Sequence, residues 1–152
     1  MKTEMLSDLS LDLTKEYPRS PREKLGPYVV AARTLDKCRA ELNDTAGEYH
    51  YNCPLDKEFF DFTGVDANAF KEAVQEGRDD EEMVEWIQAN SHKHSEETLV
   101  QWNNSLRYKR ISELANDTQV FLENYIDECL PKGAIVYHWF DVYDIEEKRI
   151  QN

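Results

Sequence analysis

The sequence has no apolar run that approaches the roughly 20 residues of a membrane-spanning helix. Its opening residues, M-K-T-E-M-L-S-D-L-S, are interrupted by acids, unlike a secretory signal. We therefore expect a cytoplasmic protein that makes no membrane contact.

Motifs for metals and cofactors are also missing. The three cysteines, Cys38, Cys53 and Cys129, lie far apart and form no C-x-x-C pair, so neither a zinc site nor a redox dithiol is predicted. His92 and His94 flank one lysine but belong to no metal-binding frame, and no glycine-rich phosphate loop occurs. We predict no metal and no cofactor.

Basic charge is scarce, and the formal net charge is −13. Residues 1–40 hold eight Lys or Arg against six Asp or Glu, so the rest of the chain carries all of the negative excess. A negative field repels phosphates, which argues against direct nucleic-acid binding by most of the surface.

Linkers, repeats and low-complexity tracts are absent, so nothing in the sequence separates two folding units. We predict a loose N-terminal arm over residues 1–16 and a single globular domain over residues 17–152. Apolar residues make up 40% of the chain, which is enough for a core and argues against disorder. Apolar residues spaced three and four apart favour an all-α fold, a compact bundle of about six to seven short helices.

Capping residues and apolar stripes predict where these helices lie. Ser20 and Pro21 resemble the N-cap and first residue of a helix. A longer helix is expected over residues 28–42, and others between the caps Cys53 and Gly64, after Asp66, after Asp79 or Asp80, and after Ser95. A further helix places its apolar residues on one side: Phe121, Leu122, Tyr125 and Cys129.

Two segments are less regular. Residues 48–52, E-Y-H-Y-N, alternate enough to predict a short extended segment. Residues 134–145 are ambiguous, because their β-branched and aromatic residues favour a strand while their spacing also fits a helix. We favour the helix.

Three stretches carry a resemblance to a known family: L-D-L-T-K-E-Y-P-R-S-P-R-E-K-L-G at residues 11–26, Y-N-C-P-L-D-K-E-F-F-D-F-T-G-V-D at 51–66 and W-F-D-V-Y-D at 139–144. The sequence resembles an uncharacterised bacterial family catalogued as a domain of unknown function, number 5069. The resemblance spans nearly the whole chain and implies no activity, substrate or catalytic residue.

The first candidate site is for an anion, at the predicted helix start. Helix N-termini bind phosphate or carboxylate through unpaired N–H groups, and guanidinium groups add bidentate donors. The cations could instead pair with the protein's own acids. The predicted anion-binding residues are Arg19, Ser20, Arg22, Lys24 and Arg33.

The second candidate is a thiol site. Cys53 stands at a predicted helix start, where a thiolate is favoured, and His50 precedes it by three residues and could act as its base. The alternative is a structural Cys53, since cysteine is among the most buried residue types. Cys38 and Cys129 lie on apolar helix faces and are expected in the core.

The third candidate is a partner interface formed by Trp139, Phe140 and Tyr143, since exposed aromatic patches mark interfaces; the same rings could simply fill a core.

These candidates leave three functions open. The chain is most simply a non-enzymatic binding or adaptor protein for a small anionic ligand or a protein partner, acting as a monomer or homodimer. The alternatives are a thiol-dependent enzyme or redox protein using Cys53 with His50, and an acidic mimic that occupies a basic protein surface. Whether the protein is an enzyme is left undecided by its sequence.

Overall fold

The computed structural model describes residues 2–149, and side chains from residue 6 onward. Over this range the chain forms eight α-helices and one 3₁₀ helix with no β-strand, so the predicted all-α fold is confirmed. Residue 1 of the predicted arm and residues 150–152 of the predicted domain lie outside the described residues. No helix within the described range is long and apolar enough to cross a membrane.

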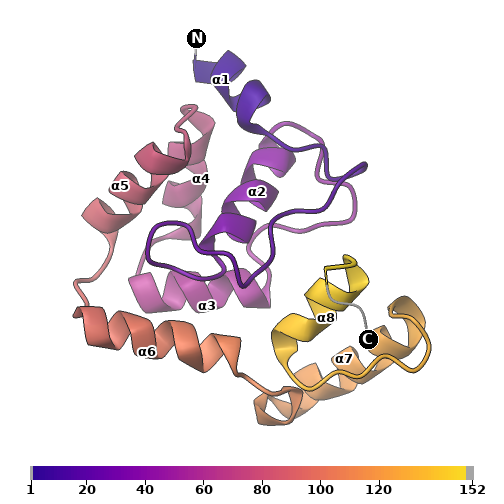
Figure 1. Cartoon of the computed structure of the whole chain (residues 1–152). Helices are drawn as coiled ribbons and strands as arrows, with labels where there is room; N and C mark the ends of the chain where they lie inside the picture. The colour runs from indigo at the N-terminus through magenta and orange to yellow at the C-terminus, as the bar shows by residue number, and fades with distance from the viewer. Residues whose placement is uncertain (1, 150–152) are drawn as a thin grey trace. The chain divides into compact units, whose positions relative to one another are not determined.

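The contacts divide the chain into two compact units, Met1–Ser95 and Glu96–Asn152, each of which is described separately (Figure 1). The single domain predicted over residues 17–152 stays a prediction. The first unit contains five helices: α1 (Lys2–Leu9), α2 (Ala31–Leu42), α3 (Pro54–Thr63), α4 (Ala67–Gln75) and α5 (Asp80–Asn90).

Helix α2 lies at the centre of the first unit, where it packs against α3 and α4, while α4 also contacts α1 and α5 (Figure 1). Every residue of α2 from Ala31 to Ala40 is buried. A helix buried on all sides is normally apolar throughout, but α2 also carries four buried charged residues: Arg33, Asp36, Lys37 and Arg39. Each charge taken from water needs a partner.

An aromatic cluster fills the space between α2, α3 and α4. Phe59 and Phe70 are fully buried, with their ring centroids 6.1 Å apart in an edge-to-face arrangement. Tyr28 meets Phe59 in the same way at 5.6 Å, and Tyr51 stacks on Phe70 at 6.1 Å. Aromatic pairs in these geometries add stability beyond their buried area.

Several predicted helix ends are confirmed. Gly64 ends α3 in the left-handed conformation, at φ 75°, where a residue without Cβ is favoured. The carboxylate of Asp66 accepts a hydrogen bond from Ala69 N at the start of α4, and that of Asp79 accepts one from Glu82 N at the start of α5. These side chains satisfy N–H groups that a helix N-terminus leaves unpaired.

The helix predicted from Ser20 and Pro21 was wrong. Ser20 Oγ accepts a hydrogen bond from Arg22 N at 3.1 Å, and Pro21 O accepts one from Val30 N at 2.8 Å. These bonds close a loop, which an isolated bridge between Leu25 and Tyr28 completes. In an α-helix a carbonyl accepts a hydrogen bond from the N–H four residues later. Pro21 O accepts one from a residue nine positions later, so Pro21 does not begin a helix.

Two other expectations in the first unit were wrong. Residues 48–52 form turns and irregular backbone where we predicted an extended segment. The N-terminal arm is not loose throughout, because α1 forms within it and Leu6 and Leu13 are buried. Leu13 N also donates to Thr45 O at 2.8 Å, which fastens the arm beyond the end of α2.

The second unit contains α6 (Glu96–Arg107), the 3₁₀ helix η1 (Ile111–Glu113), α7 (Asn116–Cys129) and α8 (Trp139–Glu146). The helix favoured over residues 134–145 is present from Trp139 onward, while residues 134–137 are irregular and His138 forms an isolated bridge with Arg110. Two backbone hydrogen bonds hold the residues before α8 beside η1, from Ile111 N to Tyr137 O and from Trp139 N to Lys109 O.

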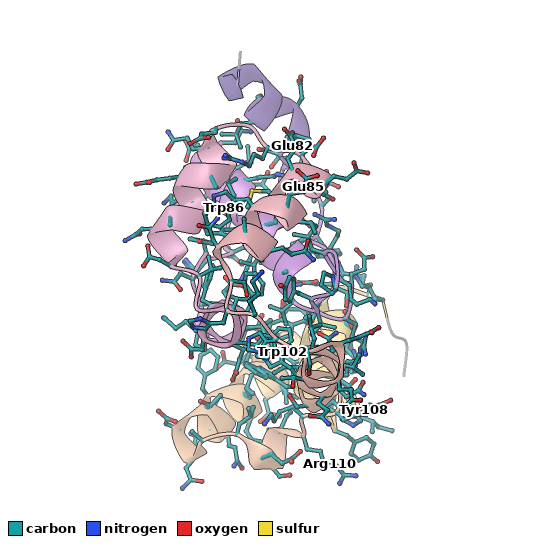
Figure 2. The ribbon with its side chains drawn as sticks, turned by 90° about the vertical axis from the view of Figure 1, so that its left-hand side faces the viewer. Glu82, Glu85, Trp86, Trp102, Tyr108 and Arg110 are labelled. Carbon is teal, nitrogen blue, oxygen red and sulfur yellow. The ribbon has the colours of Figure 1, made fainter. Side chains whose placement is uncertain are left out.

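The apolar side predicted for α7 is only partly buried. Leu122 is buried, but Phe121 is 63% exposed and Cys129 is also exposed, so the predicted core position of Cys129 was wrong. The side chain of Tyr108, which follows α6, extends from the ribbon in Figure 2 and is 68% exposed.

Candidate functional site

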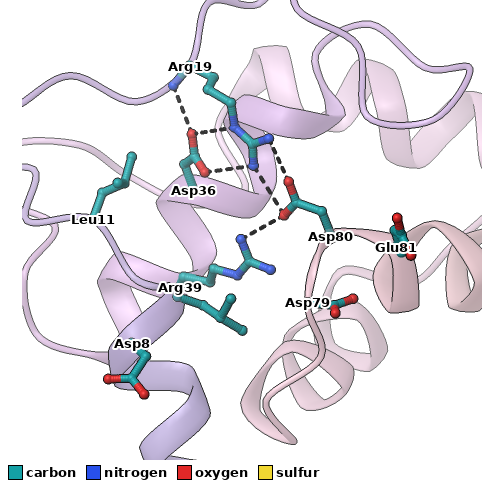
Figure 3. Close-up of a pocket in the computed structure, with 9 residues that line it drawn as sticks. Asp8, Leu11, Arg19, Asp36, Arg39, Asp79, Asp80 and Glu81 are labelled. Carbon is teal, nitrogen blue, oxygen red and sulfur yellow. Dashed lines mark hydrogen bonds and ion pairs between the residues drawn. The ribbon is translucent and has the colours of Figure 1, made fainter.

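The candidate site is an open hollow of about 640 Å³ in the first unit (Figure 3). Its lining comes from the end of α1 and the residues after it, from α2, and from the start of α5. We call it the acidic hollow, and its lining residues are Asp8, Leu9, Leu11, Arg19, Asp36, Arg39, Asp79, Asp80 and Glu81.

Arg19 joins α2 to α5 across this hollow. Its Nε and Nη2 donate to the two carboxylate oxygens of Asp36 at 3.0 and 2.9 Å, and its Nη1 donates to Asp80 at 2.8 Å (Figure 3). The backbone N–H of Arg19 also donates to Asp36, at 2.8 Å. Burial disfavours the charged guanidinium, but the two carboxylates outweigh it and raise the pKa of Arg19.

Asp80 is shared with a second arginine, Arg39. Arg39 Nη1 donates to Asp80 at 2.9 Å and Nη2 donates to the carbonyl of Arg78 at 3.0 Å. Arg39 is buried, and its Nε finds no hydrogen-bond partner within the described residues. Partial burial disfavours the carboxylate of Asp80, but the hydrogen bonds and charges of Arg19 and Arg39 outweigh this and lower its pKa.

The charges lining the hollow do not cancel. Five carboxylates face two guanidinium groups, a formal charge of −3. Asp36 and Asp80 are used by the arginines, and Asp79 caps α5. Asp8 and Glu81 are exposed and form no ion pair with any described residue. The field of the hollow therefore favours a positively charged ligand.

Of the five residues predicted to bind an anion, Arg19 is the one that lines the hollow. The side-chain N–H groups of Arg19 are engaged by the chain's own carboxylates, and Arg33 Nη1 donates to the carbonyl of Arg19 at 3.3 Å. Ser20 is buried, Arg22 is partly exposed and Lys24 is exposed. With no helix at Ser20, the physical basis of the predicted anion site is removed, although anion binding itself stays an untested prediction.

The predicted thiol pair is not brought together. His50 is exposed, and no hydrogen bond joins it to Cys53 among the described residues. The neighbour of the Cys53 sulfur is Lys37, whose Nζ donates to Sγ at 3.1 Å and to Asp56 at 2.9 Å. Cys53 does stand at the start of α3 as predicted, as its N-cap.

The predicted aromatic interface is largely internal. Trp139 and Phe140 are 4% and 0% exposed, and Tyr143 is only partly exposed. Their alternative role as core residues agrees with this burial. Partner binding through this segment is an untested prediction that now lacks an exposed aromatic patch.

The two histidines of the loop after α5 have structural contacts. The ring of His94 stacks on Phe62 at 4.0 Å and its Nε2 lies 2.9 Å from the carbonyl of the same residue. The rings of His92 and His94 are 6.5 Å apart. No group of three potential metal ligands occurs among residues 2–149.

Sequence reasoning missed Asp36, Arg39 and Asp80 as parts of one cluster. A signal was present in α2, where charged residues at positions 33, 36, 37 and 39 interrupt what is otherwise an apolar helix. The apolar stripe of Ala31, Leu35 and Cys38 predicts the helix and its core-facing side, but not that the charged residues between them are also buried. Asp80 could not be found this way, because a carboxylate in the first turn of a helix is common for other reasons.

These features describe an all-α protein with a charged hollow in its first helical unit, without a recognised catalytic arrangement among its described residues. The family model of a domain of unknown function, DUF5069, matches residues 15–149, and the chain belongs to this family, as its sequence resemblance predicts. None of the curated proteins compared with the chain matches it.

Proposed function

We propose that the protein is a non-enzymatic cytoplasmic binding protein that receives a positively charged segment of a partner protein in the acidic hollow. The observation that carries this proposal is the formal charge of −3 around an open hollow of about 640 Å³. Its two arginines are already engaged by carboxylates, so they offer little to an anion.

A basic segment suits the hollow better than a small anionic ligand does. Asp8 and Glu81 are exposed at its edge, where they can meet lysine or arginine side chains without a large desolvation cost. Negative charge over most of the chain would also accelerate the approach of a basic partner. The proposal combines the binding-protein and acidic-mimic hypotheses and keeps the monomer or homodimer open.

The test is a calorimetric titration with a short oligoarginine peptide at low and moderate salt. We expect binding that weakens as salt rises, since exposed charges are screened. In the double variant Asp8→Asn, Glu81→Gln the affinity should fall about tenfold, the equivalent of 1.4 kcal/mol. Inorganic phosphate should not bind.

A matched control separates this site from general attraction to an acidic protein. The double variant Asp61→Asn, Glu72→Gln removes the same charge from exposed positions of α3 and α4 outside the hollow. Equal weakening by both double variants would refute a specific site. Phosphate binding that is lost in Arg22→Ala, Lys24→Ala would instead favour the anion-binding hypothesis.

A further inference from the structure

A second cluster of reactive side chains lies between α2 and the start of α3, among residues that do not line the acidic hollow. Lys37 is buried, and its Nζ lies 3.1 Å from Cys53 Sγ and 2.9 Å from the carboxylate of Asp56. We propose that this cluster is an oxidation-sensitive modification site, in which peroxide joins Cys53 Sγ covalently to Lys37 Nζ.

The first requirement is access of the oxidant to sulfur. Cys53 is partly exposed. Cys38, the residue that follows Lys37 in α2, is fully buried, and burial raises its pKa to about 12. The thiolate is the species that attacks peroxide, so the buried Cys38 is protected and the partly exposed Cys53 is reachable. The ammonium group of Lys37 donates to the sulfur and stabilises negative charge there.

The second requirement is a nitrogen held in place next to the sulfur. Lys37 is only 4% exposed, so its side chain cannot move away into solvent as a surface lysine would. Asp56 holds the ammonium from the other side and is itself held by Thr34 Oγ1 at 2.7 Å and by Asn52 N at 2.9 Å. This arrangement keeps Nζ beside Sγ.

The third requirement is a place for the proton that the ammonium must lose before it becomes a nucleophile. The carboxylate of Asp56 is 2.9 Å from Nζ and can accept it. Transfer within the pair also removes two opposite charges from a fully buried position, which lowers the cost of their desolvation.

The reaction then balances in two steps. The Cys53 sulfur loses its proton and attacks hydrogen peroxide as the thiolate. The O–O bond breaks, peroxide is reduced, and the released hydroxide takes up the thiol proton, giving a sulfenic acid and one water. The lone pair of the Lys37 amine attacks the oxidised sulfur, the S–O bond breaks, and the hydroxyl leaves with an amine proton as a second water. The product is a sulfenamide, Cys53–S–NH–Lys37, and the chain has lost two hydrogen atoms.

The expected consequence is a covalent link between α2 and the N-terminus of α3 that thiol reductants reverse. Sulfenic acid that condenses with nitrogen is also protected from further, irreversible oxidation. The cluster would therefore protect Cys53 from irreversible oxidation.

The test is intact-mass analysis and peptide mapping of the whole protein after brief treatment with hydrogen peroxide. We expect a species lighter by two hydrogen atoms, a joined peptide pair containing Lys37 and Cys53, and loss of both on addition of dithiothreitol. A species in which the same two residues are joined through one inserted oxygen would support the same site.

Two variants sharpen the test. Lys37→Arg keeps the charge beside Asp56 but should abolish the joined peptides and leave Cys53 as a sulfenic acid that dimedone traps. Lys57→Arg is the matched control, because Lys57 lies on α3 nearby but is exposed, and its Nζ donates to Asn52 O. It should react as the unchanged protein does.

The proposal is overturned if Cys53 of the unchanged protein gains only oxygen, traps fully with dimedone, or stays unmodified while Cys129 is oxidised. These outcomes come from the unchanged protein, so they decide the matter even if Lys37→Arg fails to fold.

Discussion

Asp80 has an unusual position for a residue in the first turn of a helix. It begins α5, where a carboxylate already benefits from the helix dipole, and it also accepts hydrogen bonds from Arg19 and Arg39. Arg39 is buried, so the carboxylate that neutralises it is difficult to replace. One side chain thereby connects the loop at residue 19 and two helices.

We predict that Asp80→Asn lowers the free energy of unfolding by about 1–2 kcal/mol, between the values typical of exposed and buried ion pairs, because Asp80 is itself partly exposed. Glu81→Gln, one residue further along and without an ion pair among the described residues, should change it by less than about 0.5 kcal/mol. Urea unfolding of the two variants measures the difference.

The difference in free energy of unfolding between the unchanged protein and Asp80→Asn should also depend on pH. The pKa of Asp80 is lowered in the folded state, so its stabilising effect is fully present above its unfolded value and is lost as the pH falls through the lowered folded value. This difference should therefore be constant near neutral pH and should disappear in acid. A difference that widens in acid would contradict the assigned role of Asp80.

At the scale of elements, helices with a sharp cap were predictable and the loop at residues 17–30 was not. Gly64, Asp66 and Asp79 act locally, through a positive φ or a bond three residues away, so the local sequence contains the information. Ser20 and Pro21 have equally good capping chemistry, but distant bonds to Val30 and Asp36 decide the backbone there.

The candidate site was less predictable than the fold for a related reason. Arg19 was predicted to bind an anion, but the carboxylates that it meets lie 17 and 61 residues away in the chain. Spacing along a sequence predicts which residues share a helix face. It does not predict which acid among 31 will meet a given arginine.

The glycine that ends α3 supports a further prediction. Gly64 has φ 75°, and an added Cβ would meet the ring of His92. Gly133 has φ 83° and nothing within 4 Å of that position. Both substitutions by alanine should destabilise by about 1 kcal/mol through backbone strain.

The difference between the two glycines reports on the His92 contact. We expect Gly64→Ala to cost more than Gly133→Ala in urea unfolding, and the excess to disappear when His92 is also changed to alanine. Equal effects of the two single changes would mean that the loop carrying His92 moves aside without a cost in stability.

At the scale of the whole molecule, charge of one sign predominates. A net charge of −13 destabilises a compact chain by self-repulsion, and salt screens this repulsion. Salt also weakens exposed ion pairs such as that of Lys71 with Glu41, but such pairs contribute little to the stability of the fold.

We therefore predict that the unfolding temperature at neutral pH rises when the sodium chloride concentration is raised about tenfold from a low value, because the Debye length falls roughly threefold. Differential scanning calorimetry measures this directly. A lower unfolding temperature at high salt would show that ion pairs such as those of Asp80 outweigh the repulsion.

The buried charges of α2 also have a consequence for how this sequence can evolve. Asp36, Lys37 and Arg39 are each tied to a residue elsewhere in the chain, Arg19, Asp56 and Asp80 respectively. Loss of Arg19, Asp56 or Asp80 leaves a buried charge of α2 without its ion-pair partner, so natural variation at these three residues should be tolerated only together with a change in α2. Descendants of this chain would then inherit the pairs as units, while the exposed acids around them drift independently.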